Sequence, residues 1–343
     1  MAIYRKDVYC EFEFLKKFRS SNGHFSPFDS DALRVWLNVA DFIQNSHIKL
    51  DIDAQIFKKS IKRGDTLFSL WKKATEGTCK ITFLDDHKKK FFENLVVTPE
   101  GLNTAYLLAK HNAICKDFAE KYGVIILSPT CWQSNEQAKK VQYIFRDCGS
   151  KIKKNEVFNW NDILRNEYNL SYCNAAILID NYIHQNIKEN LLQIVECILP
   201  KSLRNSTFHL TILTAKNVGV SYEHIYNELI YNIKSIRPLL HCDVELYVKN
   251  GKDDFHDRCI LTNNTKIGSE AGFSLRNSNG ESKNATDIHI LHPGLQRCSD
   301  PCDQSYVDYL EDAKRFISKI ENGYCTGERF PKGRECKNRL IVG

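Results

Sequence analysis

Apolar positions in the first half of the chain switch between helical and strand spacing. In residues 31–44 apolar side chains recur from Leu33 to Ile43 at close to helical intervals, which predicts an amphipathic helix. The same criteria predict helices over 57–75 and 104–122, and strands over 48–52, 80–84 and 124–127. Gly123 ends the last helix at a position where glycine commonly adopts the left-handed C-cap conformation. Helices that alternate with short apolar strands predict an α/β domain.

The pattern becomes more regular in the second half. Strands are predicted over 175–179, 208–213, 242–248, 255–262, 265–267 and 288–291, with helices over 187–199 and 224–236. This β-α-β-α-β order implies right-handed crossovers and a largely parallel sheet with helices on both faces. If the strand over 255–262 runs antiparallel, the sheet is mixed, and this strand begins at the edge where the parallel strands end.

A charged run at 151–157 is typical of a solvated face or a linker. Together with the length of 343 residues, it predicts two domains. The expected division is 1–152 for a Rossmann-like or similar α/β domain, 153–298 for a mixed sheet flanked by helices, and 299–343 for a C-terminal helix and tail.

Composition narrows the class of protein. A hydrophobic fraction of 42% and a charged fraction of 26% are typical of a folded chain rather than a disordered one. The net charge of +6 permits a polyanionic partner without requiring one. No run of about eighteen apolar residues occurs, so integral membrane association is not expected. The N-terminal residues lack a signal-peptide pattern, so we expect a cytoplasmic protein with reduced thiols.

The thirteen cysteines are scattered along the chain. A zinc site would have to be assembled from the residues of the C-terminal region: His292, Cys298, Cys302, Cys325 and Cys336. Their spacing does not form two tight ligand pairs. Free, mostly buried thiols are therefore the preferred interpretation.

The most informative segment is 255–263, Phe-His-Asp-Arg-Cys-Ile-Leu-Thr-Asn. His256 and Arg258 are two residues apart and would point to the same side of a strand. Asn263 follows, and then Gly268 and Ser269. A histidine can attack phosphorus, and a neighbouring cation can neutralise the phosphate oxygens. The combination favours a phosphate site, although a charged pair at a strand end would also explain it.

This segment resembles the signature of the phospholipase D superfamily, which reads His-x-Lys, four residues, Asp, then Gly-Ser. Here Arg258 replaces the lysine and Asn263 the aspartate. The chain is most similar to the divergent phospholipase-D-like domain found C-terminal to MIT modules, over residues 173–276. The matching stretches are 180–183 (Asp-Asn-Tyr-Ile), 208–214, 256–260 and 267–273.

The resemblance implies roles for several residues. His256 would be the nucleophile or general acid, Arg258 and Asn263 would hold the phosphate, and Asp180 would orient. Residues at neighbouring strand ends would contact the substrate: Tyr182, Thr214 and Ser269. Family members combine two such motifs and this chain has one, so an active enzyme would need a homodimer. No cofactor is expected at this site. The branch linked to MIT modules is thought to bind membranes or partners rather than to cut.

The N-terminal half weakly resembles PIN-type nucleases, which gather acidic residues at strand ends to hold divalent metal. The candidate ligands are acids near predicted strands and helices: Asp7, Glu11, Asp41, Asp85 and Asp86. A solvated surface role also explains them. Basic stretches at 58–63 and 87–90 could contact a nucleic-acid backbone or could be ordinary helix surface.

We therefore expect a phosphodiester-directed protein, a nuclease-type effector of bacterial defence or toxin systems, acting on nucleic acid as a homodimer. A protein partner from the same system would fit that setting. The alternative is a non-catalytic phosphate-recognising module that binds nucleic acid, a lipid headgroup or a protein.

Overall fold

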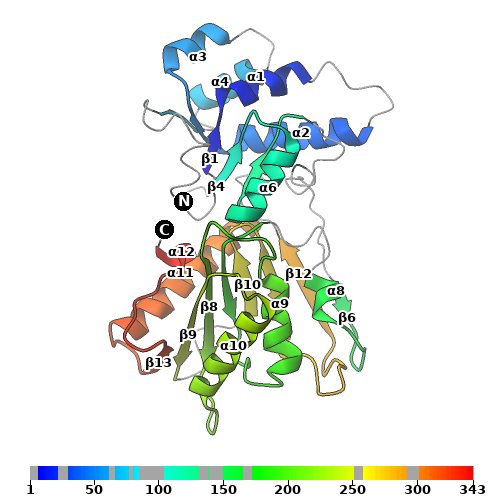
Figure 1. Cartoon of the computed structure of the whole chain (residues 1–343), viewed down its shortest axis with the longest axis vertical. Helices are drawn as coiled ribbons and strands as arrows, with labels where there is room; N and C mark the ends of the chain where they lie inside the picture. Colours follow the sequence, from blue (N-terminus) through cyan, green and yellow to red (C-terminus); the bar gives the residue numbers. More distant parts are fainter. Residues whose placement is uncertain are drawn as a thin grey trace. The chain divides into compact units, whose positions relative to one another are not determined.

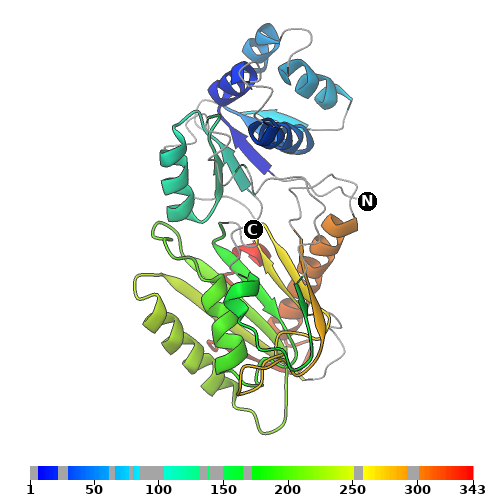
Figure 2. The same cartoon turned by 90° about the vertical axis from the view of Figure 1, so that its right-hand side faces the viewer.

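The structure is a computed structural model of the chain (Figures 1 and 2). It describes residues 7–21, 30–61, 66–76, 80–84, 104–130, 138, 150–164, 172–250, 258–291 and 301–342. The chain divides into two compact units, residues 1–145 with 294–303, and residues 146–293 with 304–343. Within the described part, no helix is both long enough and apolar enough to cross a membrane.

The first unit contains a five-stranded, all-parallel sheet of order β3-β2-β1-β4-β5. Its strands are β1 (Asp7–Cys10), β2 (His47–Leu50), β3 (Lys80–Phe83), β4 (Thr104–Leu107) and β5 (Ile125–Leu127). Its helices are α1 (Phe12–Ser21), α2 (Ser30–Asn45), α3 (Ala54–Ser60), α4 (Thr66–Thr75) and α6 (Asn112–Tyr122). The expected Rossmann-like α/β architecture is confirmed.

Two of the predicted helices of this unit were wrong in extent. The prediction over 57–75 corresponds to two helices, because α3 ends where Ile61 turns to an extended conformation. The prediction over 104–122 merged a strand with a helix. Residues 104–107 form the strand β4 between β1 and β5, and α6 begins after His111, whose Nδ1 accepts the N–H of Ala113. A short apolar run does not by itself distinguish a buried strand from a helix.

The sheet of the first unit has two different faces. Val8, Cys10, Ile48 and Leu50 are fully buried in the core that α1 and α2 complete. The intervening residues of β1 and β2 are polar or aromatic and only partly buried. Both faces of a parallel sheet are usually apolar, so this polar face is unusual.

The second unit contains an eight-stranded mixed sheet of order β13-β9-β8-β7-β10-β11-β12-β6. Its strands are β6 (Ser150–Ile152), β7 (Ala175–Ile179), β8 (Phe208–Ala215), β9 (Cys242–Lys249), β10 (Arg258–Thr262), β11 (Lys266–Ser269), β12 (Thr286–Leu291) and β13 (Gly327–Phe330). β7, β8 and β9 are parallel, and the remaining neighbours pair antiparallel. The expected mixed sheet is confirmed, but the prediction of a largely parallel sheet was wrong, because five of its seven strand pairs are antiparallel.

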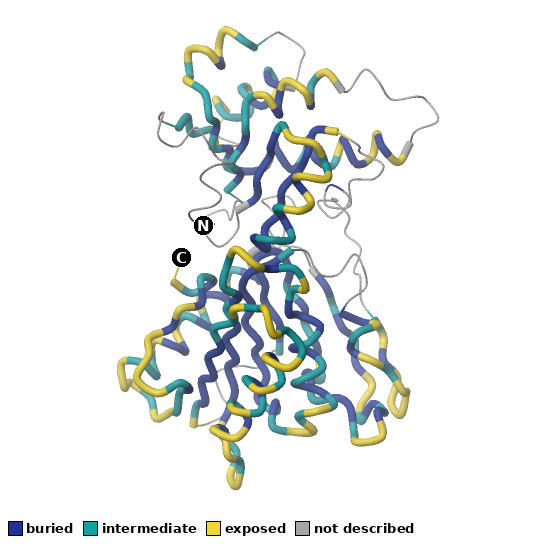
Figure 3. The backbone as a smooth tube through the Cα atoms, in the orientation of Figure 1, coloured by how far each residue is buried: buried dark blue, intermediate teal, exposed yellow. Residues whose placement is uncertain are grey.

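Helices cover both faces of this sheet (Figure 1). They are α8 (Trp160–Leu164), the π-helical turn η3 (Lys188–Leu192), α9 (Gln193–Ile198), α10 (Tyr222–Ile236), α11 (Pro301–Glu321) and α12 (Arg339–Val342). Leu178, Ile212 and Ile260 face α9 and α10 in one continuous core. Figure 3 shows the central strands buried and the outer sides of the helices exposed.

The C-terminal tail packs on the sheet of the second unit. β13 pairs with β9, and Asn338 is completely buried against the sheet. Its Nδ2 donates to the carbonyl of Ala176 at 2.9 Å and to Oγ1 of Thr211 at 3.0 Å. β6 is the outermost strand on the side of the sheet opposite β13, and it pairs with β12. Residues 150–152 therefore belong to the sheet of the second unit, although the predicted first domain included them.

Candidate functional site

The predicted site residues of the second unit meet at one edge of the sheet. β10 runs antiparallel to β7, so it begins at the edge where β7 and β8 end. The last paired residues of these two strands are Cys259 and Ile179, so the next residues, Arg258 and Asp180, lie opposite each other. Arg258 also pairs with Ser269 of β11, and Thr214 of β8 lies beside Asp180. Thr214, Asp180, Arg258 and Ser269 therefore form a row, called here the strand-end row.

Asp180 holds the backbone at this edge. Its side chain is buried, and its Oδ1 accepts the N–H of Tyr182 at 2.8 Å while its Oδ2 accepts the N–H of Phe273 at 2.6 Å. Burial raises the pKa of Asp180, and the backbone N–H groups and Arg258 oppose this effect. The carboxylate therefore ties the residues after β11 to the end of β7.

Gly272 is required by the same arrangement. Its φ is +84°, a conformation that residues with a side chain rarely adopt. A Cβ placed there would lie 3.1 Å from Oδ2 of Asp180 and 3.4 Å from Cδ of Arg258. Ser269 closes the turn by donating its Oγ hydrogen to the carbonyl of Gly272 at 2.5 Å. Ser269 thus stabilises the loop rather than facing outward.

Arg258 is held from two sides. Its Nη1 donates to the carbonyl of Glu270 at 3.0 Å, and its Cζ lies 5.5 Å from the centre of the Tyr182 ring. The Tyr182 ring in turn lies 6.5 Å from the ring of His184. Arg258 has no ion-pair partner within 4.0 Å among the residues that the structure describes. Its charge therefore lies at this edge of the sheet, and no described residue neutralises it through a salt bridge.

Two polar atoms of the strand-end row have no hydrogen-bond partner in the described structure. They are Oγ1 of Thr214 and Nε of Arg258, and both are buried. A buried polar group without a partner costs about 1–3 kcal/mol. Such groups are uncommon in folded proteins and call for a physical reason.

Asn263 does not join this row. It follows β10 at the opposite edge of the sheet, where its Oδ1 accepts the N–H groups of Asn174 at 2.9 Å and Ala175 at 3.0 Å. Asn263 lies five residue steps along the chain from Arg258, a distance of about 17 Å at roughly 3.3 Å per residue. The prediction that Arg258 and Asn263 hold one phosphate together is therefore wrong, because the extended strand places the two side chains at opposite ends of β10.

Several predicted residues lie outside the described residues. They are His256 and its neighbours Phe255 and Asp257, the acids Asp85 and Asp86, the basic stretch 87–90, and the cysteine-region residues His292 and Cys298.

The acids of the first unit are distributed differently from the prediction. Asp7 lies at the start of β1, and Asp41 lies within α2. Glu11 follows β1, and its Oε2 accepts the N–H of Ala109 at 2.7 Å; burial raises the pKa of Glu11. Asp51, which was not among the predicted ligands, follows β2 and accepts the N–H of Phe12 at 2.6 Å. Of the acids named here, only Glu11 and Asp51 occupy the carboxyl edge where ligands of parallel sheets bind.

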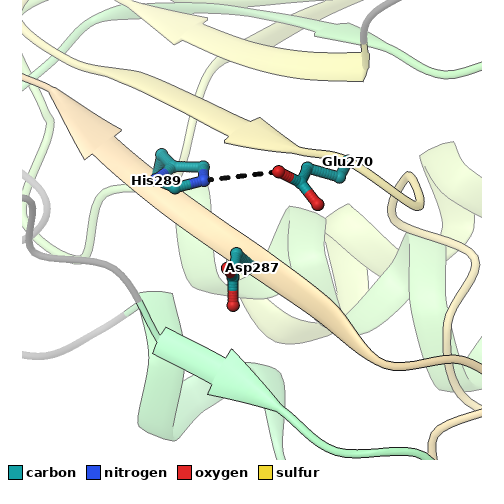
Figure 4. A group of neighbouring side chains, drawn as sticks. All are labelled: Glu270, Asp287 and His289. Carbon is teal, nitrogen blue, oxygen red and sulfur yellow. Dashed lines mark ion pairs between the residues drawn. The ribbon is translucent and has the colours of Figure 1, made fainter.

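Within the described residues, one group offers three metal-ligating atoms close together, and it lies in the second unit (Figure 4). Glu270 follows β11, and Asp287 and His289 lie two apart on β12, so they share a face. The ligand atoms lie within 4.8 Å of one another. Carboxylates and an imidazole suit a divalent metal, but Nζ of Lys151 lies 3.8 Å from Asp287 and competes for its charge. The Asp-x-His spacing on a strand was the signal that could have indicated this group.

Comparison with known proteins adds no family assignment. No protein-family model matches the chain, and no curated protein matches it.

Proposed function

We propose that the second unit recognises the phosphate group of a nucleic-acid phosphodiester at the strand-end row, with Arg258 as the main cation. The observation that carries this proposal is that Arg258 is fixed at the sheet edge by the Glu270 carbonyl and the Tyr182 ring, without an ion-pair partner among the described residues. A guanidinium held in this way loses little freedom when it binds an oxyanion.

The neighbouring Asp180 carboxyl group makes no ion pair with Arg258 within 4.0 Å in the described structure. Both of its oxygens already accept backbone N–H groups. The planar guanidinium has five donors, of which one is used by Glu270. Its remaining donors suit the paired oxygens of a phosphate, which arginine binds in a bidentate manner.

Phosphodiester cleavage is the second candidate. It is favoured by the direction of β10, which begins at the edge where β7 and β8 end. In the sequence His256 precedes Arg258 by two residues. His256 would attack phosphorus, Arg258 would neutralise the phosphate oxygens, and a second copy of the chain would supply the histidine that protonates the leaving group. The defence or toxin setting belongs to this same candidate.

Binding to short fluorescent DNA and RNA, single- and double-stranded, tests the recognition proposal. Arg258→Gln should weaken binding about 10- to 100-fold, because a charge-assisted hydrogen bond contributes about 1.5–3 kcal/mol. Arg315→Gln is the matched control, since Arg315 lies exposed on α11 and pairs with Asp312. Equal affinities of the two variants for every nucleic acid would refute the proposal.

Cleavage of the same substrates separates the two candidates. Cutting that persists in EDTA and disappears in His256→Ala would identify a histidine-dependent phosphodiesterase. Cutting that stops in EDTA and survives His256→Ala would point to a metal centre elsewhere in the chain. Binding without cutting would leave phosphate recognition as the function.

A further inference from the structure

The polar face of the sheet in the first unit carries a chain of hydrogen bonds across three strands. Nδ1 of His47 on β2 lies 2.8 Å from Oδ1 of Asp7 on β1. Nε2 of the same ring lies 2.9 Å from Oγ1 of Thr82 on β3. The order is hydroxyl, imidazole, carboxylate, with the two ring nitrogens divided between them.

The carboxylate decides which ring nitrogen carries the proton. Asp7 can only accept when ionised, so Nδ1 of His47 holds the hydrogen and donates it. Nε2 is then left with a lone pair and accepts the hydrogen of the Thr82 hydroxyl. Nζ of Lys49 lies 3.0 Å from the other oxygen of Asp7, which holds the carboxylate in place.

Three charged groups face the imidazole from the three strands: Asp7 on β1, Lys49 on β2 and Lys80 on β3. Burial lowers the pKa of His47, and Asp7 opposes this while Lys80 adds to it. A neutral imidazole is therefore the dominant form at neutral pH, which is the form that accepts a proton from a hydroxyl.

The group can be reached from solvent. The side chain of Asp7 is 41% exposed and that of His47 18% exposed, and Thr82 is also partly exposed. Lys80 pairs with His47 in the strand register and is exposed on the same face. Its positive charge would attract negative charge that develops on a bound electrophile.

We propose that Thr82, His47 and Asp7 form a hydrolytic site in which the Thr82 hydroxyl is the nucleophile toward a carboxylic ester. A nucleophile within hydrogen-bond reach of a base that a third group orients is the arrangement from which activated hydroxyls are recognised. This site lies in the first unit and does not depend on the function proposed for the second.

The reaction proceeds in two balanced steps. Oγ1 of Thr82 forms a bond to the carbonyl carbon while its proton moves to Nε2 of His47. The bond to the alcohol then breaks, and the alcohol oxygen takes that proton. Water attacks the acyl-threonine by the same route, with His47 again taking and returning the proton, and the acid is released.

An alkyl fluorophosphonate tests the proposal on the full chain. It reacts with an activated hydroxyl by forming an O–P bond and losing fluoride, and the hydroxyl proton passes to His47. Intact-mass measurement and peptide mapping should find one adduct, located on Thr82. Thr82→Val has no hydroxyl and should carry no adduct at position 82. His47→Gln should label about 100-fold more slowly, the contribution expected of a general base.

Two further variants make the result specific. Thr82→Ser should label at least as fast as wild type, because a primary hydroxyl is less hindered. Thr75→Val should behave as wild type, since Thr75 is an exposed threonine whose hydroxyl donates to the Lys72 carbonyl. The labelling rate of the wild type should rise with pH and reach its plateau by about pH 7, because the pKa of His47 lies below its usual value of about 6.5.

The proposal fails if the wild-type chain carries no adduct on Thr82, or if the adduct lies on another residue. It also fails if Thr82→Val labels at the wild-type rate. Should Thr82→Val not fold, as judged by circular dichroism, adduct mapping on the wild type and on Thr82→Ser decides the question. Esterase activity toward p-nitrophenyl acetate should follow the same order among the variants.

Discussion

Replacement of Asp180 by asparagine tests how the strand-end row is held together. In the native protein its two oxygens accept the N–H groups of Tyr182 at 2.8 Å and Phe273 at 2.6 Å. Asparagine keeps one acceptor oxygen and presents an NH2 group to the other N–H, so one buried donor loses its partner. The loss of a charge-assisted bond is about 1.5–3 kcal/mol, and relief from burying a charge offsets part of it. We expect a net destabilisation of about 2 kcal/mol.

Urea unfolding followed by tryptophan fluorescence measures this loss. Trp160 is fully buried in the second unit, and its ring lies 5.9 Å from that of Phe273, so it reports on the region that Asp180 holds. Asp312→Asn makes the same change of charge in an exposed pair on α11, where an effect below about 0.5 kcal/mol is expected. If the two variants were equally stable, the buried carboxylate would not be holding the loop.

The pH dependence of the same comparison has a definite sign. Burial raises the pKa of Asp180, so the folded state holds this proton more tightly than the unfolded chain. The resulting stabilisation is fully present below the unfolded pKa of about 4 and is lost as the pH rises through the folded pKa. The difference in stability between wild type and Asp180→Asn should therefore widen on acidification. A difference that narrows would contradict the direction of the shift.

Three further predictions concern stability. Burial, assisted by the charge of Arg339, lowers the pKa of His209 to about 4. The stability of the protein should therefore fall as the pH drops from about 6.5 toward 4. His209→Gln should remove about 1–2 kcal/mol of that loss after solvent screening, as measured by urea unfolding at both pH values. Gly272→Ala should lower the melting temperature more than Gly219→Ala; both glycines have positive φ, but only at Gly272 does a Cβ meet other side chains. Asn338→Ala should cost about 2–3 kcal/mol by leaving buried partners unsatisfied, and limited proteolysis should then cut the C-terminal tail faster.

Much of the second unit could be predicted because its signals are local. Residues 175–179 form an apolar run, and residues 242–248 begin with alternating apolar and polar residues; β7 and β9 lie there. The helix predicted over 224–236 is α10, which begins two residues earlier with Ser221 as its N-cap. These elements depend mainly on neighbouring residues, whose spacing and caps the sequence displays directly.

The candidate site was harder, because it depends on which strands become neighbours. The sequence placed Arg258 near Asp180 only on the condition that β10 runs antiparallel, and the structure meets that condition. The same strand carries Asn263 to the far edge, where it accepts the N–H groups of Asn174 and Ala175. A family motif read as a string does not show that four intervening strand residues span the sheet.

By itself, then, the sequence determined the alternation of helices and strands, the two-part α/β organisation, and which side chains share a face of a strand. Those properties follow from backbone geometry over a few residues. Tertiary structure alone decided the partners of distant residues: Asp180 with Phe273, 93 positions later, and His47 with Asp7 and Thr82. Such pairs form because burial of the whole sheet selects one strand order and register, and no short segment contains that information.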